Sequence, residues 1–374
     1  MRVYLLKTDY HYSAEQVMCH TKIKISIRQS LLLLLTLFFP KIYSQTCNCY
    51  EDLKFLTTSY TQNYSGIKDF INSHPRYTQA VDSLINVSIN SSEINKCDSL
   101  ISSFINYINN GHVVFGRTKE NPLFRPQKKE KSNSPALKIL NSKTVLISIP
   151  SADLSYKAEL DSLIKLNKLL IDTAEHFIID LRGNGGGGDA MFNELISYLY
   201  TNPIISYGVE LWTSETNVKM FENLLSNPNI PTESKKRIEA ILNKAKENPN
   251  KYVLLSDTKV DTLTKNTVLK YPKNISLLIN KECKSATEQF LLLAKQSTKV
   301  TIYGYENSGG ALDYSNLNVI ILPSKYWYAT VPTTRSTRLP KNPVDPTGIK
   351  PDIILNRQIK DPIKFIIRKN NNGI

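Results

Sequence analysis

The hydrophobic positions between residues 50 and 110 recur with the spacing of one face of an α-helix. The clearest series has the spacing i, i+1, i+4, i+5 and i+8 and comprises Leu100, Ile101, Phe104, Ile105 and Ile108. This spacing gathers apolar side chains on one side of a helix, where they can be buried against a core. The pattern predicts a small helical N-terminal domain over residues 45–118.

The chain becomes polar and proline-containing at residues 119–136, KENPLFRPQKKEKSNSPA, which predicts a linker or exposed loop. Beyond it, short β-branched apolar segments alternate with amphipathic ones, so residues 137–356 are expected to form an α/β layer domain. Strands are expected at 143–149, 177–181, 276–280, 300–303, 317–322 and 326–331, the last two as a hairpin. Helices are expected at 156–171, 189–200, 232–247 and 285–296, and a C-terminal tail at 357–374.

A short apolar run, SLLLLLTLFFP at residues 30–40, follows three basic residues near the N-terminus. A basic segment, a short apolar core and a small residue after it are typical of a secretory signal peptide, predicted here with its leader over residues 1–44. The run is about half of the ~20 residues that a membrane-spanning helix needs, so no integral membrane span is expected. The protein is therefore predicted to be exported to the periplasm, the cell envelope or the medium.

Other interpretations of the N-terminal region stay open. The apolar run could be a buried N-terminal helix. Cys47 could be the lipidated residue of a lipoprotein, although Ser44-Gln45-Thr46 is a poor match to the motif that precedes such a cysteine. Because the stretch before Met18 is unusual ahead of a signal peptide, translation starting at Met18 rather than Met1 is a further hypothesis.

Composition narrows the class of protein without defining it. The chain has 374 residues, of which 41% are hydrophobic and 21% charged, which excludes a collagen-like or wholly disordered chain. The formal net charge is +14, and the leader holds six basic and two acidic residues, which leaves 14 − 4 = +10 for the remainder. The charge is spread along the chain without an arginine-rich block or an aromatic-basic repeat, so no nucleic-acid partner is expected.

Four cysteines follow the leader: Cys47, Cys49, Cys97 and Cys283. Export makes disulfides possible, and either Cys47 or Cys49 could pair with Cys97, while Cys283 is expected to be a free core thiol. The spacing does not decide the pairing. Cys47 and Cys49 are too close in sequence for an ordinary zinc pair, and no other set of residues has zinc-ligand spacing, so no metal is expected.

The first candidate site follows the predicted strand at 177–181. Residues 183–188, GNGGGG, hold five glycines among six positions before the next helix begins at Asp189. Glycine lets the backbone turn sharply and present bare N–H groups, which can bind a phosphate, a carboxylate or a developing oxyanion. The spacing matches neither the dinucleotide-binding G-x-G-x-x-G pattern nor a Walker loop. A flexible turn without a ligand is the structural alternative.

The second candidate site is Ser285, at the point where the strand 276–280 turns into the helix 285–296. Ser285-Ala286-Thr287-Glu288 fits the capping box, so one interpretation is that the Ser285 hydroxyl caps the helix. The other is that the hydroxyl is a nucleophile. A helix N-terminus stabilises negative charge near the serine, and the Ala286 N–H is placed to donate to an oxyanion.

Taken together, DLRGNGGGGD at 180–189 and KSATEQF at 284–290 resemble motifs of the tail-specific, or C-terminal processing, serine peptidases. GIKPDI at 348–353 is similar to the Gly-Ile-x-Pro-Asp ending of that family. The resemblance includes the family's tricorn-like and interphotoreceptor-retinoid-binding-like branch and covers most of residues 50–356. It implies a caseinolytic-protease/crotonase-like α/β core. Residues 113–142 leave no room for the PDZ domain that the processing branch often inserts.

The resemblance also implies roles for individual residues of this chain. Ser285 matches the nucleophile, and the Ala286 N–H together with the Gly186 and Gly187 backbone matches the oxyanion hole. The processing branch uses a lysine in a glycine-flanked turn beyond the serine helix, but the matching stretch 304–311, GYENSGGA, has none. Lys295 and Lys299 lie at other positions and do not match it.

The tricorn-like branch instead uses a histidine in a turn after an N-terminal helix, and Asn110-Gly111-His112 resembles that turn. His112 is therefore expected to be the general base; His74, in a polar loop, and His176, before a core strand, are less suitable. A base needs an orienting carboxylate. The position that matches the family's usual Glu is Asp345, one methylene shorter, whereas Asp352 is expected to be structural.

The resemblance implies an exported serine peptidase that hydrolyses peptide or protein substrates through an acyl-enzyme on Ser285, with no metal or organic cofactor. One alternative is a catalytically inactive peptide- or ligand-binding protein on the same fold, since the lysine is missing and Asp replaces Glu. Another is a crotonase-like acyl-thioester enzyme, which export disfavours. Arg335 and Arg338 could pair with a substrate carboxylate, but surface charge is the simpler interpretation. The substrate, endo- or exo-cleavage and the oligomeric state are not predicted.

Overall fold

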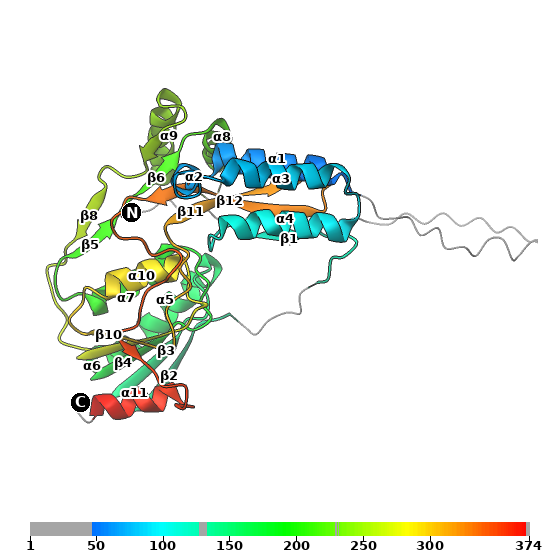
Figure 1. Ribbon diagram of the computed structural model, residues 1–374. Helices are drawn as coiled ribbons and strands as arrows, with labels where there is room; N and C mark the ends of the chain where they lie inside the picture. The colour runs from blue at the N-terminus through cyan, green and yellow to red at the C-terminus, as the bar shows by residue number, and fades with distance from the viewer. Residues whose placement is uncertain (1–46, 127–132, 229, 231, 372–374) are drawn as a thin grey trace, which may run out of the picture.

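The computed structural model describes residues 47–126, 133–228, 230 and 232–371 (Figure 1). The expected signal peptide, the segment Ser44–Thr46 and part of the expected linker lie outside these residues. Within the described ranges, no helix is both long and apolar enough to cross a membrane.

A six-stranded sheet forms the centre of the predicted α/β region. Its strand order is β13-β10-β9-β4-β3-β2, and neighbours are parallel except for β2 and β3. The two middle strands are buried on both faces, as their continuous apolar runs predict. The strands are β2 Ala136–Asn141, β3 Thr144–Ser148, β4 His176–Asp180, β9 Asn274–Ile279, β10 Val300–Gly304 and β13 Ile353–Ile354.

The parallel pairing of β4 with β9 brings the two candidate sites together. Asp180, the last residue of β4, is in register with Leu278, near the end of β9. The glycine segment follows β4 and Ser285 follows β9, so both emerge from the same edge of the sheet. The carboxyl ends of parallel strands are where α/β folds usually place their ligands.

Helices cover both faces of this sheet (Figure 1). One face carries α5 Lys157–Leu166, α6 Lys168–Thr173, α7 Asn193–Leu199 and α10 Ala286–Ala294. The helix expected at 156–171 is interrupted at Asn167, and the helix expected at 189–200 begins with a 3₁₀ turn, Asp189–Phe192. The other face is covered by α11, Pro362–Asn371, whose Ile366 is fully buried, so part of the expected tail is a packed helix.

A second, antiparallel sheet has the order β1-β12-β6-β7, with β11 also paired to β12. Its strands are β1 Phe115–Arg117, β6 Val209–Trp212, β7 Tyr252–Leu254, β11 Tyr314–Ile321 and β12 Trp327–Ser336. The antiparallel β11–β12 pair confirms the predicted hairpin. Helices α8 Glu215–Leu225 and α9 Thr232–Glu247 pack beside β6, and β5 Ile204–Tyr207 pairs with β8 Val260–Leu263 as a separate ribbon.

The predicted N-terminal helices lie against this second sheet (Figure 1). They are α1 Cys49–Asn63, α2 Ile67–Ser73, α3 Tyr77–Ile89 and α4 Ile94–Ile108. The apolar face of α4 is buried together with Trp327, Ala329 and Val331 of β12. The helical segment and the hairpin at 314–336 therefore share one hydrophobic core.

The cysteines fasten the N-terminal helices to each other. Cys97, on α4, lies close enough to pair with Cys49, the first residue of α1, or with Cys47, which precedes that helix. The three sulfur atoms, all buried, lie within 4.8 Å of one another. Because one sulfur forms one disulfide, Cys97 pairs with a single partner at a time. Cys283 is a free, fully buried thiol, as predicted, and its burial raises its pKa to about 12.

Candidate active site

The glycine segment after β4 packs directly against the Ser285 turn. The Asn184 carbonyl accepts hydrogen bonds from the Lys284 N–H and the Thr287 hydroxyl, each 3.1 Å long. Gly186 has φ of +98°, and a Cβ atom there would lie 2.6 Å from the Ser285 Cβ and 3.2 Å from the Ala286 nitrogen. Only glycine fits this position, because both the space and the backbone conformation exclude a side chain.

Ser285 itself has an unusual backbone conformation, with φ of +57° and ψ of −121°. An N-cap residue ordinarily lies in the β region. The Ser285 N–H faces the Ala311 carbonyl oxygen and the Glu288 carboxylate, each at 3.1 Å, which holds the turn in place. Residues held in such conformations cluster at functional sites, and a tight strand-to-helix turn of this kind is one way to present a nucleophile.

Backbone N–H groups near Ser285 differ in whether they are already occupied. The Gly186 N–H donates to the Asn184 side chain (3.0 Å), although the sequence resemblance included Gly186 among the oxyanion donors. Within the described ranges, the N–H groups of Gly187 and Ala286 have no hydrogen-bond partner. Gly187, with φ of +146°, is pressed against Ala152, where a Cβ would clash with the Ala152 carbonyl.

His112 lies in the turn after α4, which ends at Asn109 in the left-handed conformation. The His112 N–H donates to the Asn110 side-chain oxygen (3.0 Å), and the ring Nδ1 lies 2.6 Å from the Tyr314 carbonyl oxygen. A carbonyl only accepts, so Nδ1 carries the proton and Nε2 keeps its lone pair. Burial lowers the pKa of His112, the Tyr314 carbonyl raises it and the charge of Lys284 lowers it further. A neutral imidazole with a free Nε2 is the form that a general base requires.

Ala311 connects the histidine turn to the serine turn. A Cβ on Gly111 would clash with the Ala311 Cβ, so the residue before His112 packs on Ala311. The Ala311 carbonyl in turn accepts the Ser285 N–H. The fold thus brings together two turns that lie far apart in sequence. In the part of the chain that the structure describes, no hydrogen bond joins the Ser285 hydroxyl to His112.

The position of Asp345 differs from the expected one. The sequence predicted contact with the imidazole, but the ring faces the Tyr314 carbonyl. One Asp345 carboxylate oxygen accepts the Asn110 amide (2.9 Å), and the other accepts the N–H groups of Leu312 (2.6 Å) and Asp313 (3.0 Å). The pKa of Asp345 is raised to about 7, first by burial and then by the charge of Asp313. Asp345 therefore reaches His112 through Asn110 rather than directly.

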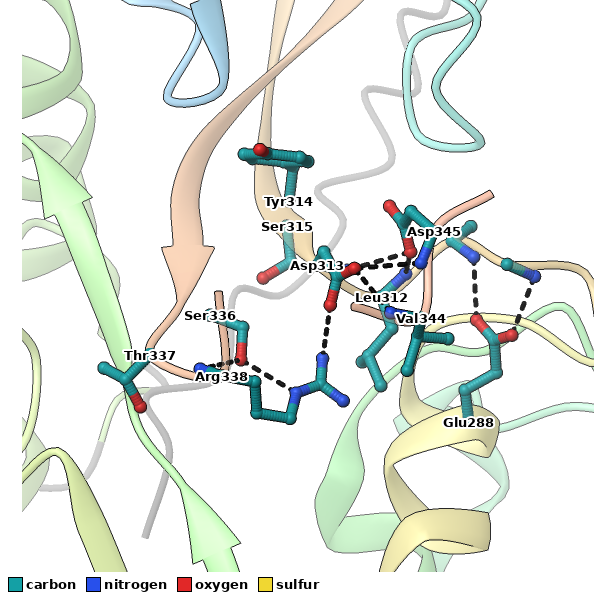
Figure 2. Close-up of polar contacts among 12 residues, drawn as sticks. Glu288, Leu312, Asp313, Tyr314, Ser315, Ser336, Thr337, Arg338, Val344 and Asp345 are labelled. Carbon is teal, nitrogen blue, oxygen red and sulfur yellow. Dashed lines mark hydrogen bonds and ion pairs between the residues drawn. The ribbon is translucent and has the colours of Figure 1, made fainter. Parts of the chain in front are cut away.

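Glu288 is a central residue that the sequence identified only as half of a capping box. Its carboxylate is fully buried and accepts hydrogen bonds from the Ser308 hydroxyl (2.6 Å) and the N–H groups of Gly310 and Ala311 (both 2.8 Å), besides facing the Ser285 N–H. Figure 2 shows Glu288 below this loop, beside Asp345. It fixes the segment 308–311 against the start of α10.

The other candidate residues have structural partners away from Ser285. Lys295 pairs with Asp352, whose carboxylate also accepts the Ile302 N–H (2.8 Å), in line with the structural role expected for Asp352. Lys299 donates to the Leu269 carbonyl. His176 contacts Ser276, and His74 contacts the Phe70 carbonyl.

Of the two arginines, Arg335 is partly exposed, whereas Arg338 is not the surface charge that the sequence suggested. Arg335 pairs with Glu210 and Asp69 and lies over the Tyr252 ring. Arg338 is only 4% exposed and pairs with Asp313, which is 1% exposed. A buried guanidinium is costly unless it is paired with an acid, so the Asp313 carboxylate accounts for the buried position of Arg338.

The comparisons with known proteins agree with this architecture. A family model described as Peptidase family S41 matches residues 143–355, so the chain belongs to this peptidase family. A search of curated proteins finds no match. Family membership supports peptide-bond hydrolysis over the acyl-thioester chemistry considered above.

Several solved structures share the fold. A putative peptidase from Parabacteroides merdae is 13% identical, with a TM-score of 0.55 over 88% of this chain and 99% of that one. Mature CPAF complexed with lactacystin is 12% identical, with a TM-score of 0.61 over 87% and 99%. A lipoprotein from Streptococcus agalactiae is 16% identical, with a TM-score of 0.51 over 89% and 100%. At these identities the likeness establishes the fold, an S41 α/β core with helices at its N-terminal side.

Proposed function

We propose that this protein is an exported serine peptidase in which Ser285 forms an acyl-enzyme and His112 is the general base. The observation that carries the proposal is the position of His112: its Nδ1 faces the Tyr314 carbonyl, and its turn packs on Ala311, whose carbonyl accepts the Ser285 N–H. The signal-peptide pattern of residues 1–44 supports export.

In the proposed reaction, His112 Nε2 takes the hydroxyl proton as Ser285 Oγ attacks the substrate carbonyl carbon. The same nitrogen then gives that proton to the leaving amine, which departs as the acyl-enzyme forms. A water molecule, deprotonated by Nε2, attacks the ester, and Ser285 recovers its proton. The peptide bond is thereby replaced by a carboxylic acid and an amine.

The oxyanion of the tetrahedral intermediates would be bound by the N–H groups of Ala286 and Gly187. These two donors are preferred over Gly186 because the Gly186 N–H already donates to Asn184. Removing one such donor costs about 3–4 kcal/mol of transition-state stabilisation in known serine enzymes. The helix α10 begins at Ala286, so its N-terminal dipole adds to the same field.

The alternative function is a catalytically inactive peptide- or ligand-binding protein. The feature that favours it is the His112 ring, which is oriented by a backbone carbonyl rather than by a carboxylate and makes no hydrogen bond to Ser285 within the described ranges. A neutral carbonyl stabilises the imidazolium less than a carboxylate does, which would lower the rate of proton transfer.

The two functions are separated by labelling the purified protein with a fluorophosphonate probe, alongside Ser285→Ala and His112→Ala. The expected result is labelling of the unmodified protein that both substitutions abolish. Labelling that survives His112→Ala but not Lys284→Gln would assign the base to Lys284. Absence of labelling in a folded protein would favour the binding function.

A further inference from the structure

The buried ion pair between Asp313 and Arg338 is adjacent to Asp345. We propose that this pair holds His112 in the position and tautomer that a general base requires. The inference rests on the proposed role of His112 as general base. Figure 2 shows Asp313 between Arg338 and Asp345, with Tyr314, the first residue of β11, above Asp313.

Asp313 joins two loops through its two carboxylate oxygens. One oxygen accepts the Arg338 guanidinium at 2.7 Å. The other accepts the backbone N–H groups of Val344 (2.7 Å) and Asp345 (2.9 Å). A charged side chain used in this way fixes backbone groups more strongly than a neutral one, because charge-assisted hydrogen bonds are about twice as strong.

The contact is reciprocal. Asp345 accepts the N–H of Asp313, while Asp313 accepts the N–H of Asp345. Each loop thus presents a carboxylate to the backbone of the other, and Arg338 neutralises the inner carboxylate. We call Asp313, Arg338 and Asp345 the carboxylate clasp.

Two of the contacts that hold His112 begin at the carboxylate clasp, whereas a third, from the Thr330 hydroxyl to the His112 carbonyl (2.6 Å), anchors the turn to β12. Tyr314, whose carbonyl accepts the Nδ1 proton, follows Asp313 directly in sequence. Asp345 holds the Asn110 amide, and the Asn110 oxygen accepts the His112 N–H. A shift of Asp313 would therefore move the ring acceptor and the backbone anchor of His112 together. In enzymes, a misplacement of about 1 Å can cost about 100-fold in rate.

A purely structural role makes a different prediction. A buried ion pair contributes little net stability compared with an apolar replacement, but removing one partner is strongly destabilising. Loss of stability alone therefore cannot distinguish the two roles. The readout must be the state of His112 itself.

The test uses Asp313→Asn, Arg338→Met and the double variant, in the full mature chain. The rate of fluorophosphonate labelling is measured together with the ring ¹⁵N signals of His112 in histidine-labelled protein. The mature chain holds only three histidines, His74, His112 and His176, so assignment by His112→Gln is direct. We expect each single variant to label at least tenfold more slowly and to lose the pure Nδ1–H tautomer.

A control variant separates positioning from stability. Leu242→Ala lies in the apolar cluster of α8 and α9, away from His112, and should lower the melting temperature without changing labelling or tautomer. Asp313→Glu keeps the charge but displaces it, and is expected to behave like Asp313→Asn. If a single variant does not fold, the double variant replaces it, because it removes both charges of the pair. It is likewise expected to label at least tenfold more slowly and to lose the pure Nδ1–H tautomer.

Three outcomes are decisive. Folded Asp313 and Arg338 variants that label at the unmodified rate and retain the Nδ1–H tautomer would overturn the carboxylate clasp, while the proposed function would stand. An unmodified protein that does not label would overturn the proposed function, and the tautomer measurement would still decide the clasp. The third outcome is that the Asp313 and Arg338 variants label more slowly, that Leu242→Ala with the same melting temperature labels equally slowly, and that the His112 tautomer is unchanged. This result would mean that the ion pair contributes to stability alone.

Discussion

The Nδ1 atom of His112 lies 2.6 Å from the carbonyl oxygen of Tyr314. This single contact fixes the tautomer of the ring and directs the lone pair to Nε2. A backbone carbonyl can perform this part of an orienting acid's role, but it brings no negative charge to the imidazolium. The carboxylate of Asp345 does not contact the ring; it accepts a hydrogen bond from the side-chain amide of Asn110, two residues before His112.

The pKa of His112 is lowered by burial and by the nearby charge of Lys284. Because the neutral ring is the form that the proposed base requires, labelling of Ser285 should decline at a lower pH than the titration of an ordinary histidine would give. Lys284→Gln removes a positive neighbour, so the pKa of His112 should rise and the decline should move to higher pH. The ring titration, followed by NMR, measures this directly.

Lys281→Gln is the matched control for that shift, since Lys281 is exposed and is not among the groups that shift the His112 pKa. An unchanged His112 titration in Lys284→Gln would contradict the assigned electrostatic contact.

Asp345 should make the stability of the protein fall with rising pH. Its pKa is raised from 3.8 in the unfolded chain to about 7 in the folded one, first by burial. Between these values the folded state holds a proton that the unfolded state has lost, so the free energy of unfolding decreases as the pH rises. The contribution between pH 5 and pH 8 is on the order of 2 kcal/mol.

Asp345→Asn should therefore narrow the difference in unfolding free energy between pH 5 and pH 8, measured by urea denaturation. Asp257→Asn, at an exposed position, is the control and should leave the difference unchanged. An equal pH dependence in Asp345→Asn and the unmodified protein would contradict the raised pKa.

Two neighbouring glycines offer a matched pair for testing the oxyanion segment. Gly186→Ala would force a Cβ to within 2.6 Å of the Ser285 Cβ at a φ of +98°, whereas a Cβ on Gly185 meets nothing within 4 Å. Gly186→Ala should slow labelling by about 100-fold and destabilise the fold by about 1–3 kcal/mol. Gly185→Ala should change neither by a measurable amount.

The cysteine cluster predicts a disulfide between Cys49 and Cys97, with Cys47 close enough to replace Cys49 as the partner of Cys97. The Cα separation is 5.3 Å for Cys49 and Cys97 but 7.5 Å for Cys47 and Cys97, and only the first lies in the usual range. Peptide mapping without reduction should find Cys49 joined to Cys97, with Cys47 as a thiol. Closing a loop of 48 residues stabilises the fold by about 4 kcal/mol.

Because Cys47 also reaches Cys97, Cys49→Ser should lose less stability than Cys97→Ser, which leaves no cross-link to α4. Denaturation curves of the two variants test the order. A Cys47–Cys49 disulfide in the peptide map would contradict this arrangement.

The parts of the fold that the sequence predicted best are those with long apolar runs. β4, β9 and α10 each carry such a run, and parallel pairing then requires Ser285 and the glycine segment to meet at one edge. The helix α11 was missed because its short apolar series follows a proline and a polar stretch that resemble a tail.

The environment of His112 was predicted only in part. The turn Asn110-Gly111-His112 has a sequence signature, but its acceptor is the Tyr314 main-chain oxygen, which no residue type reveals. The buried state of Arg338 was also hidden, because its partner Asp313 lies 25 positions away, across the β11–β12 hairpin. Contacts of this kind depend on how loops cross, which local patterns do not encode.

The core that α4 shares with β12 also has a consequence for the order in which parts of the molecule can fold. During synthesis the turn with His112 leaves the ribosome first, yet the surface on which α4 packs comes near the end of the chain. Asp345 follows later still. A growing or truncated chain that lacks β12 therefore has no surface against which α4 can bury its apolar face, and it has no Asp345 to hold Asn110 beside His112.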